Sequence, residues 1–186
     1  MPHPTRRIFV AGAALLAAVP GAAWAAADPE NTIYLDTKNG RITIRLRPDL
    51  APKHVAQIKA LVRRGFYDGL TFHRVIDGFM AQTGDPNGNG TGGSDLPDLP
   101  GEFSKTEKFK RGTVGMARAR SPNSANSQFF ITFDAAPNLD GAYTIWGEVV
   151  SGMDVVDKIK KGDPGRNGTV DAPDKIVRMR VAADAK

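Results

Sequence analysis

The run FHRVIDGFMAQ at residues 72–82, followed by NSQFFI at residues 126–131, decides how this chain is interpreted. Short apolar stretches separated by turn-forming residues are typical of β-strands. The two runs therefore predict strands over 71–75, 79–83 and 128–132. They also gather arginine, glutamine, phenylalanine and methionine side chains into short segments, so they hold the candidate functional residues as well.

The segment before these runs predicts a hairpin and one helix. Apolar and polar residues alternate over 33–35 and 42–46, and Lys-Asn-Gly lies between them at 38–40, so we expect a β-hairpin with Asn-Gly at its turn. Apolar residues then recur at helical spacing over 52–64. A proline in the first turn and a glycine after the last turn bound this helix.

The rest of the chain continues a mainly β pattern. Further strands are predicted over 113–117, 143–149 and 175–181, and a second short helix over 152–159. Eight mostly antiparallel strands separated by turns favour closure, because a closed sheet has no exposed edge. We therefore predict a closed eight-stranded antiparallel β-barrel with two α-helices. It forms one domain over 31–184, without internal repeats or linkers.

The composition excludes several classes of protein and site. The chain has 186 residues, of which 41% are hydrophobic, which is enough for a full-sized core in one domain. It contains no cysteine, which excludes disulfides, thiol nucleophiles and cysteine-based metal sites. The net charge of +5 is weak evidence for nucleic-acid binding, because charge alone reports on nonspecific association. We predict no nucleic-acid partner.

Residues 1–25 have the three-part pattern of a secretory signal peptide. Two arginines at 6–7 precede twelve uncharged residues and a small-residue site, so we expect cleavage after Ala25 or Ala27. Twelve residues fall short of the roughly 20 that a membrane span needs. The arginine pair fits both the general secretory and the twin-arginine route. We predict an exported, periplasmic protein that has no membrane anchor after cleavage and carries a net charge of +3, since two arginines and no acidic residue are lost.

No metal or cofactor site is predicted. The glycine-rich segment 84–93 lacks the lysine of a phosphate loop, and leucine stands where a calcium loop has its final glutamate. The three histidines, His3, His54 and His73, have the wrong spacing for a metal cluster, and we place His54 on the polar side of the first helix. Asn-Gly-Thr at 167–169 is a formal glycosylation sequon, which matters only in a eukaryotic source.

Five ordered motifs resemble the cyclophilin family of peptidyl-prolyl isomerases. They are FHR-x-x-x-GFM-x-Q at 72–82, NGTGG at 89–93, G-x-x-x-MA at 112–117, SQFFI at 127–131 and LDG at 139–141. The resemblance covers about residues 33–181. It implies a peptidyl-prolyl cis-trans isomerase that needs no cofactor and acts on proline-containing polypeptides, assisting protein folding.

The chemistry of prolyl isomerisation explains why such residues are needed. Rotation about an X-Pro bond breaks no covalent bond, but amide resonance opposes it with a barrier of about 18–20 kcal/mol. A hydrogen-bond donor aimed at the proline nitrogen binds the twisted amide better than the planar one, which lowers the barrier. Arg74 offers a protonated, planar fork of donors, and the resemblance assigns it this role.

The resemblance also assigns the other site residues. Gln82 is the second catalytic residue, because it orients Arg74. The substrate-binding residues are Phe79, Met80, Ala117, Arg118, Gln128, Phe130, Leu139 and Tyr143. Within that set, the phenylalanine, methionine and leucine side chains seat the proline ring, and Gln128 orients Arg74 and the substrate backbone. Backbone groups at 117–118 pair with the residues before proline as an added strand. The side chain of Arg118 is incidental to that pairing.

At two positions this sequence departs from the cyclophilin pattern in residues that affect ligand binding. Asn138 stands where many eukaryotic members have tryptophan, and Tyr143 stands where they have histidine. Loss of the indole predicts weak cyclosporin binding, whereas Tyr143 keeps a flat apolar face for substrate. We expect a monomer. The alternative function is a noncatalytic proline-peptide-binding chaperone that uses the same groove; Arg74 favours the enzyme, because a binder can seat proline without it.

Overall fold

The computed structural model describes Met1 and residues 28–185. Apart from Met1, the predicted signal peptide lies outside the described residues. In the part of the chain that is described, no helix is long and apolar enough to cross a membrane.

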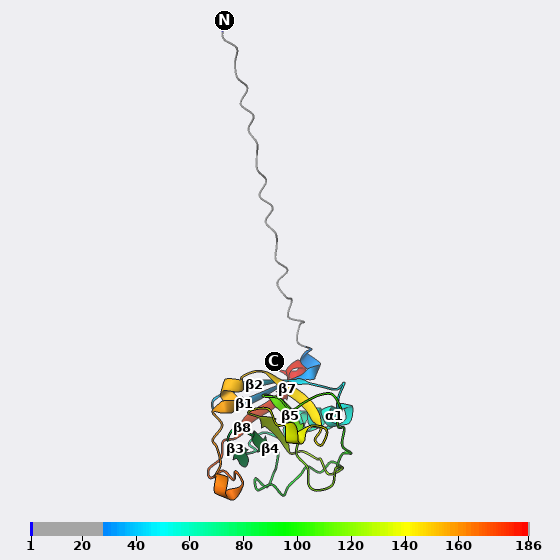
Figure 1. The fold of residues 1–186 in the computed structure, drawn as a ribbon, viewed down its shortest axis with the longest axis vertical. Coiled ribbons are helices and arrows are strands. Elements are labelled where there is room, and N and C mark those ends of the chain that lie inside the picture. The colour runs from blue at the N-terminus through cyan, green and yellow to red at the C-terminus, as the bar shows by residue number, and fades with distance from the viewer. Residues whose placement is uncertain (2–27, 186) are drawn as a thin grey trace.

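Eight strands and two α-helices form the domain, as predicted (Figure 1). In chain order they are β1 (Thr32–Thr37), β2 (Gly40–Leu46), α1 (Pro52–Arg63), β3 (Arg74–Ile76), β4 (Met80–Thr83), β5 (Thr113–Met116), β6 (Phe129–Thr132), β7 (Ile145–Ser151), α2 (Met153–Asp157) and β8 (Ile176–Val181). Four single-turn 3-10 helices, which the sequence patterns did not predict, are η1 (Pro29–Asn31), η2 (Pro137–Leu139), η3 (Pro164–Arg166) and η4 (Ala182–Asp184).

The eight strands belong to one antiparallel sheet with the order β3-β4-β6-β5-β7-β2-β1-β8. The alternating apolar residues of β1 and β2 are fully buried, as their period-2 pattern predicted. Gly40 pairs with Thr37 and so opens β2, which makes Lys38 and Asn39 the two-residue turn in place of Asn39-Gly40. The Thr37 hydroxyl holds this turn, because it accepts the N–H of Asn39 and donates to Gly40 O, both at 3.1 Å.

The prediction of a closed barrel is wrong, because the sheet is an open half-barrel. Within the described chain the two edge strands, β3 and β8, form no ladder with each other. The start of β8 meets only the segment that precedes β3, through an isolated bridge between Thr71 and Lys175 in which the N–H of Ile176 donates to Leu70 O at 2.8 Å. The outer edge of β3 is covered by a loop instead, where the N–H of Val75 donates to Gly168 O at 2.8 Å. That loop protects the edge that closure was expected to remove.

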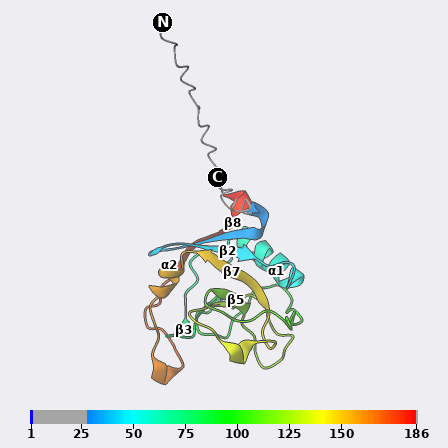
Figure 2. The ribbon, with the colours of Figure 1, turned by 45° about the horizontal axis from the view of Figure 1, so that its top comes forward.

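The helices cover the half-barrel on opposite sides, with β2 and β7 between them (Figure 2). The N-terminus of α1 is capped by a carboxylate distant in sequence, since Glu102 accepts the backbone N–H groups of Lys53 (3.2 Å) and His54 (3.1 Å). The Nδ1 atom of His54 also lies 2.6 Å from Glu102 Oε2, and the side chain is fully buried. His54 was predicted on the polar side of the helix, but it is buried, because the loop carrying Glu102 covers it.

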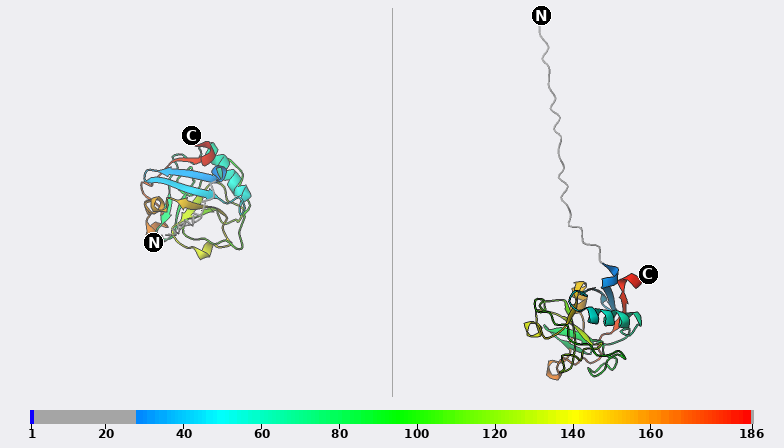
Figure 3. Two further views of the ribbon diagram at one scale, coloured as in Figure 1. Left: turned by 90° about the horizontal axis from the view of Figure 1, so that it is seen from above. Right: turned by 90° about the vertical axis from the view of Figure 1, so that its right-hand side faces the viewer.

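The two ends of the described domain lie side by side (Figure 3). Arg63, in the last turn of α1, joins them: its Nε donates to Asp184 Oδ2 at 2.8 Å, and its Nη2 donates to Glu30 Oε2 at 2.9 Å. One guanidinium thus fastens both ends of the domain to the helix.

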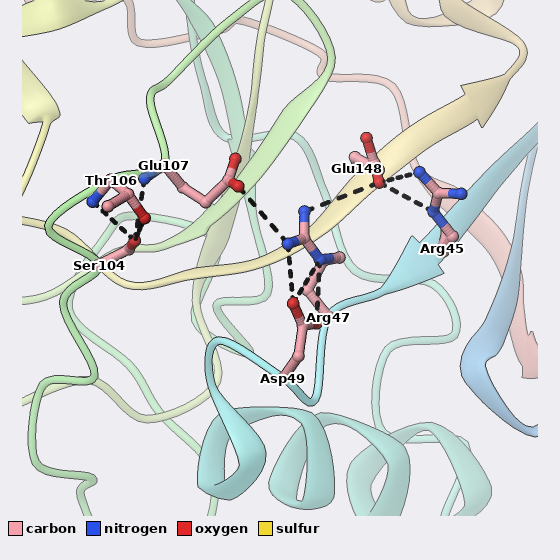
Figure 4. A network of polar contacts seen from close by, with 7 residues as sticks. All are labelled: Arg45, Arg47, Asp49, Ser104, Thr106, Glu107 and Glu148. Atoms are coloured by element: carbon pink, nitrogen blue, oxygen red, sulfur yellow. Dashed lines mark hydrogen bonds and ion pairs between the residues drawn. The ribbon is translucent and has the colours of Figure 1, made fainter.

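A second arginine network fastens the loop that precedes β5 (Figure 4). Arg47 donates to Asp49 at 2.9 Å and lies 3.6 Å from Glu107, and Arg45 donates to Glu148 on β7 at 2.8 Å. Such exposed ion pairs contribute at most about 1 kcal/mol each. The contact between Arg47 and Glu107 ties the loop to the end of β2, and the loop leads into the site described next.

Candidate active site

The register of three neighbouring strands brings the predicted catalytic residues together. Arg74 lies opposite Gln82 on the β3–β4 pair, and Gln82 lies opposite Phe130 on the β4–β6 pair. Residues that lie directly opposite each other project from the same face of a sheet. The arginine, the glutamine and the phenylalanine therefore form one row across the end of the sheet.

A cavity of about 250 Å³ opens beside this row, and we call it the apolar cavity after the phenylalanine, methionine and leucine side chains in its wall. β6 is buried on both faces: Phe129 and Ile131 join the main core, whereas Phe130 joins a smaller cluster on the opposite side. Nine of the ten predicted site residues line the cavity, with Asn138 as the remaining wall: Arg74, Phe79, Met80, Gln82, Ala117, Arg118, Phe130, Leu139 and Tyr143. The structure thus assembles the predicted set, except Gln128, around one hollow.

The half-buried Arg74 guanidinium is held at three of its five N–H groups. Its Nη1 donates to Gln82 Oε1 at 3.1 Å, its Nε donates to the backbone oxygen of Asn167 at 3.0 Å, and its Nη2 donates to Asn167 Oδ1 at 3.0 Å. Arginine carries five such donors. One N–H on each terminal nitrogen is therefore left for a ligand in the cavity.

All the acceptors that hold Arg74 are neutral. Among residues 28–185 no carboxylate forms an ion pair with it, although most other arginines of the domain have one. Burial lowers the pKa of the Arg74 guanidinium from its ordinary value, and the nearby Tyr143 opposes this shift. The group stays protonated, because an arginine loses its proton only at extreme pH. Its positive charge is uncompensated and lies at the cavity wall.

A chain of amide groups extends from Arg74 to the glycine-rich loop. Gln82 Nε2 donates to Gln128 Oε1 at 2.9 Å, and Gln128 Nε2 in turn donates to Gly92 O at 2.8 Å and Gly90 O at 3.2 Å. Gln128 thus lies one step behind the cavity and orients Gln82. Each amide is fixed in direction, because its oxygen accepts and its nitrogen donates.

The glycine-rich loop itself is built around a buried carboxylate. Asp85 accepts the backbone N–H groups of Asn87 (2.8 Å), Asn89 (2.9 Å) and Gly92 (3.0 Å). Burial alone would raise the pKa of the Asp85 carboxyl, but these hydrogen bonds hold its pKa below the ordinary value. A Cβ on Gly92 would lie 2.2 Å from Asp85 Oδ1, so only glycine allows this close approach. In the described ranges, no group of three or more His, Asp or Glu side chains could hold a metal ion.

The Phe130 ring is fixed by the predicted Tyr143 and by Phe109, which the sequence patterns did not identify. It stacks on Phe109 with ring centroids 5.7 Å apart, and it meets the edge of Tyr143 at 6.0 Å. Both phenylalanine rings lie over Gly115 on β5, where a Cβ would approach each of them to 2.7 Å. The glycine therefore makes room for the aromatic floor of the cavity.

A second cavity, of about 450 Å³, adjoins the first. Gln82, Ala117 and Arg118 line both, so the two form one continuous groove along the end of β5. The second cavity is mainly polar and includes the carboxylate of Asp98 and the hydroxyl of Ser124. A ligand seated in the apolar cavity can therefore extend as a chain past Ala117.

A family model described as cyclophilin type peptidyl-prolyl cis-trans isomerase/CLD matches residues 32–181. The chain belongs to the cyclophilin family. This match confirms the resemblance that the five motifs indicated. The protein is a cyclophilin-type peptidyl-prolyl cis-trans isomerase, as its relatives are named.

Relatives and solved structures agree with this assignment. A probable peptidyl-prolyl cis-trans isomerase of Brucella suis biovar 1 is 60% identical, over 97% of this chain and 98% of the relative. A peptidyl-prolyl cis-trans isomerase of Helicobacter pylori is 44% identical, over 69% of this chain and 80% of the relative. Among structures, the cyclophilin AquaCyp293 of Hirschia baltica superposes with a TM-score of 0.77 at 30% identity, over 86% of this chain and 77% of its own.

A further structural neighbour is a Cryptosporidium parvum cyclophilin crystallised in the presence of the dipeptide Ala-Pro. It superposes with a TM-score of 0.74 at 29% identity, over 81% of this chain and 98% of its own. An X-Pro dipeptide is the smallest unit that contains the bond a prolyl isomerase rotates.

Some residues of this cyclophilin site were missed by sequence reasoning. Asn167 contacts Arg74 from 93 positions away in the chain, and nothing in the local pattern distinguished it from a sequon. Phe109 falls in a charged segment that reads as surface loop. Gly115 did carry a signal, because a glycine inside a predicted strand often marks a close approach of another group.

Proposed function

We propose that this cyclophilin rotates X-Pro bonds in extended or unfolded segments of exported proteins, with the proline ring in the apolar cavity and Arg74 directed at the amide nitrogen. The observation that carries the assignment of the catalytic group is the uncompensated Arg74 charge at the wall of that cavity. Twisting the X-Pro bond frees a lone pair on the proline nitrogen, and a donor placed there stabilises the twisted form selectively.

The donors left on Arg74 meet this requirement. The arginine presents two N–H groups beyond those held by Gln82 and Asn167. A donor to the twisted nitrogen supplies stabilisation that the planar amide cannot use. A difference of about 5–6 kcal/mol between the two forms would speed the rotation roughly 10⁴-fold.

The apolar cavity suits the proline ring. Met80, Phe130 and Leu139 are buried around it, and a volume of about 250 Å³ accommodates a five-membered ring with part of its backbone. Burial of the ring against this wall stabilises the planar and the twisted state alike. The apolar cavity therefore binds the proline ring, and Arg74 provides the preference for the transition state.

The groove past Ala117 suits the residues before proline. The N–H of Ala117 already donates to Gln128 O at 2.9 Å, so it is not free to bind substrate. Within residues 28–185, Ala117 O and the N–H of Arg118 have no backbone partner. We assign these two groups to main-chain pairing with the substrate, which does not depend on the identity of the substrate's side chains.

Export of this cyclophilin is proposed from residues 1–25 alone. Their basic start, uncharged stretch and small-residue end are the pattern of a cleaved signal. N-terminal sequencing of protein from a periplasmic extract should find a chain that begins at Ala26 or Asp28. Recovery of the intact chain from the cytosol would contradict export.

The decisive experiment compares rate and binding in the same variants. Arg74→Ala should lower kcat/KM by about 10²–10³-fold, or roughly 3–4 kcal/mol, while a proline peptide still binds within a few-fold. Arg74→Lys should rescue little, because an ammonium lacks the planar fork. Phe130→Ala should weaken binding and rate together, because the seat serves both planar and twisted forms.

Three outcomes separate the possibilities. Accelerated isomerisation that collapses in Arg74→Ala supports the proposed mechanism. Loss of binding in step with rate would make Arg74 a substrate anchor instead. Tight peptide binding without acceleration in the wild-type chain would favour the chaperone alternative.

A further inference from the structure

The loop that covers the free edge of β3 is joined to that strand by backbone hydrogen bonds. Val75 donates to Gly168 O at 2.8 Å, and Val170 donates to His73 O at 3.1 Å, so the loop runs alongside the strand that carries Arg74. The loop is also closed on itself, because Gly168 donates to Asp163 O at 2.9 Å. Its geometry relative to β3 is therefore fixed by backbone bonds.

Asn167, in this loop, accepts two hydrogen bonds from Arg74, and we call this pair of bonds the Asn167 grip. Its backbone oxygen accepts from Arg74 Nε and its side-chain oxygen accepts from Nη2, each at 3.0 Å. Two parallel bonds to one edge of a guanidinium fix both its position and its plane. Gln82 accepts from the third nitrogen at 3.1 Å, so the grip of Asn167 decides where the two remaining N–H groups point.

We infer that Asn167 is a positioning residue of the isomerase, whose neutral two-point grip directs the Arg74 donors at the substrate amide without compensating the arginine charge. This inference rests on the function proposed for Arg74. It assigns Asn167 an effect on turnover rather than on the proline seat, since Asn167 is not among the residues that line the apolar cavity.

The chemistry of the position explains why asparagine fits it. Asn167 has φ of 53°, in the left-handed region that asparagine and glycine adopt more readily than other residues. Glycine would accept the backbone but would lose the side-chain oxygen. Aspartate would keep the geometry but place a negative charge against Arg74, which would cancel the potential that the twisted amide requires. Of these three residues, asparagine alone combines the left-handed conformation with a neutral side-chain acceptor.

Three substitutions separate the grip from the stability of the loop. Asn167→Gly removes the amide without strain, Asn167→Ala removes it and adds left-handed strain, and Asn167→Asp keeps an isosteric acceptor with a charge. Arg166→Gln is the matched control, because Arg166 pairs with Asp163 and Asp171 within the loop and does not touch Arg74. Isomerisation of an X-Pro peptide is followed by exchange NMR, which works across a wide pH range, and peptide affinity by titration.

The grip predicts a specific pattern. Asn167→Gly and Asn167→Ala should lose similar factors in kcat, about tenfold, although only the alanine variant should lose thermal stability. Peptide affinity should change less than threefold in both. Asn167→Asp should lose about 10–100-fold at pH 7 and regain activity as the pH is lowered, because protonation restores a neutral acceptor. The Arg166→Gln control should keep its kcat.

Other results would overturn the inference. If kcat follows thermal stability across the variants, or if Arg166→Gln loses as much as Asn167→Gly, the loop acts only as a structural cover of β3. Wild-type kcat in Asn167→Asp at pH 7 would show that the neutrality of the acceptor is irrelevant. Arg74→Ala tests the proposed function separately: if Arg74→Ala is impaired and the Asn167 variants are not, only the present inference fails.

Discussion

Arg118 lays its guanidinium over the ring of Tyr143, with Cζ 4.5 Å from the ring centroid. The same guanidinium donates to Ala142 O at 3.1 Å, so it is fixed above the ring. Both residues line the apolar cavity, and Arg118 lines the adjoining polar one as well. The side chain that sequence reasoning left without a role thus forms the boundary between the two halves of the groove.

Removing this pair should weaken substrate binding more than turnover. A cation over an aromatic face contributes about 0.5–2 kcal/mol, and Arg118 also covers part of the cavity. We expect Arg118→Ala to raise the Kd of a proline peptide about three- to tenfold with little change in kcat. Arg120→Ala, an exposed neighbour, is the control. A fall in kcat at unchanged Kd would show that Arg118 takes part in rotation itself.

Gly115 should not tolerate a side chain. Its Cβ would lie 2.7 Å from both Phe109 Cε1 and Phe130 Cζ, so Gly115→Ala forces the aromatic floor of the cavity to move. We expect a loss of about 1–3 kcal/mol in the free energy of unfolding, together with weaker peptide binding. Adding Phe109→Leu should restore much of both by giving the methyl group room. Urea denaturation and peptide titration of the single and double variants measure this, and strictly additive losses would contradict the explanation.

Asn138 should control affinity for cyclosporin. The residue lines the cavity beside Leu139, so a larger side chain at this position faces the ligand directly. We expect Asn138→Trp to tighten binding by about 1–2 kcal/mol through added apolar burial and an indole donor. Asn138→Phe, which adds area without the donor, should give only part of the gain. Calorimetric titration that finds no gain, or tight binding in the native chain, would show that Tyr143 or the turn geometry dominates.

Acid should destabilise the fold through the pair formed by His54 and Glu102. Burial lowers the pKa of His54 despite the opposing effect of Glu102, so below about pH 6.5 the unfolded chain binds a proton that the folded chain resists. Burial would raise the pKa of Glu102, but its hydrogen bonds with His54 and the helix N–H groups hold the pKa below its ordinary value. The stability from Glu102 is therefore present above its unfolded pKa and lost as the pH falls through the folded one. Both contributions decline in the same direction.

Chemical denaturation between pH 7.5 and 4 tests whether the stability of the fold falls as the pH is lowered. The urea midpoint should begin to fall below about pH 6.5. The buried His73 also has a lowered pKa, so the urea midpoint of the wild type alone does not report on His54. The informative quantity is the difference in urea midpoint between the wild type and His54→Gln. That difference should narrow as the pH is lowered from 7 to 5. A difference that does not change with pH would mean that His54 titrates alike in the folded and unfolded chains.

The amino-acid sequence by itself determined the elements and most of the site. Alternation fixes which side chains of β1 and β2 face the core, because strand geometry has a strict period of two residues. The ordered motifs identified the family, and nine of the ten residues they pointed to line one cavity. These features depend on short-range geometry or on motifs with fixed spacing, which a linear pattern records directly.

Only the tertiary structure decided the features that depend on distant contacts. Period and spacing do not say whether β3 meets β8, and the backbone of the loop around Gly168 occupies that edge, so the half-barrel stays open. The same docking brings Asn167 onto Arg74, and helix packing buries His54 against Glu102. In each case a polar residue looks like ordinary surface in the sequence. Its role appears only when folding supplies a partner tens of positions away, because hydrogen bonding depends on distance in space and not along the chain.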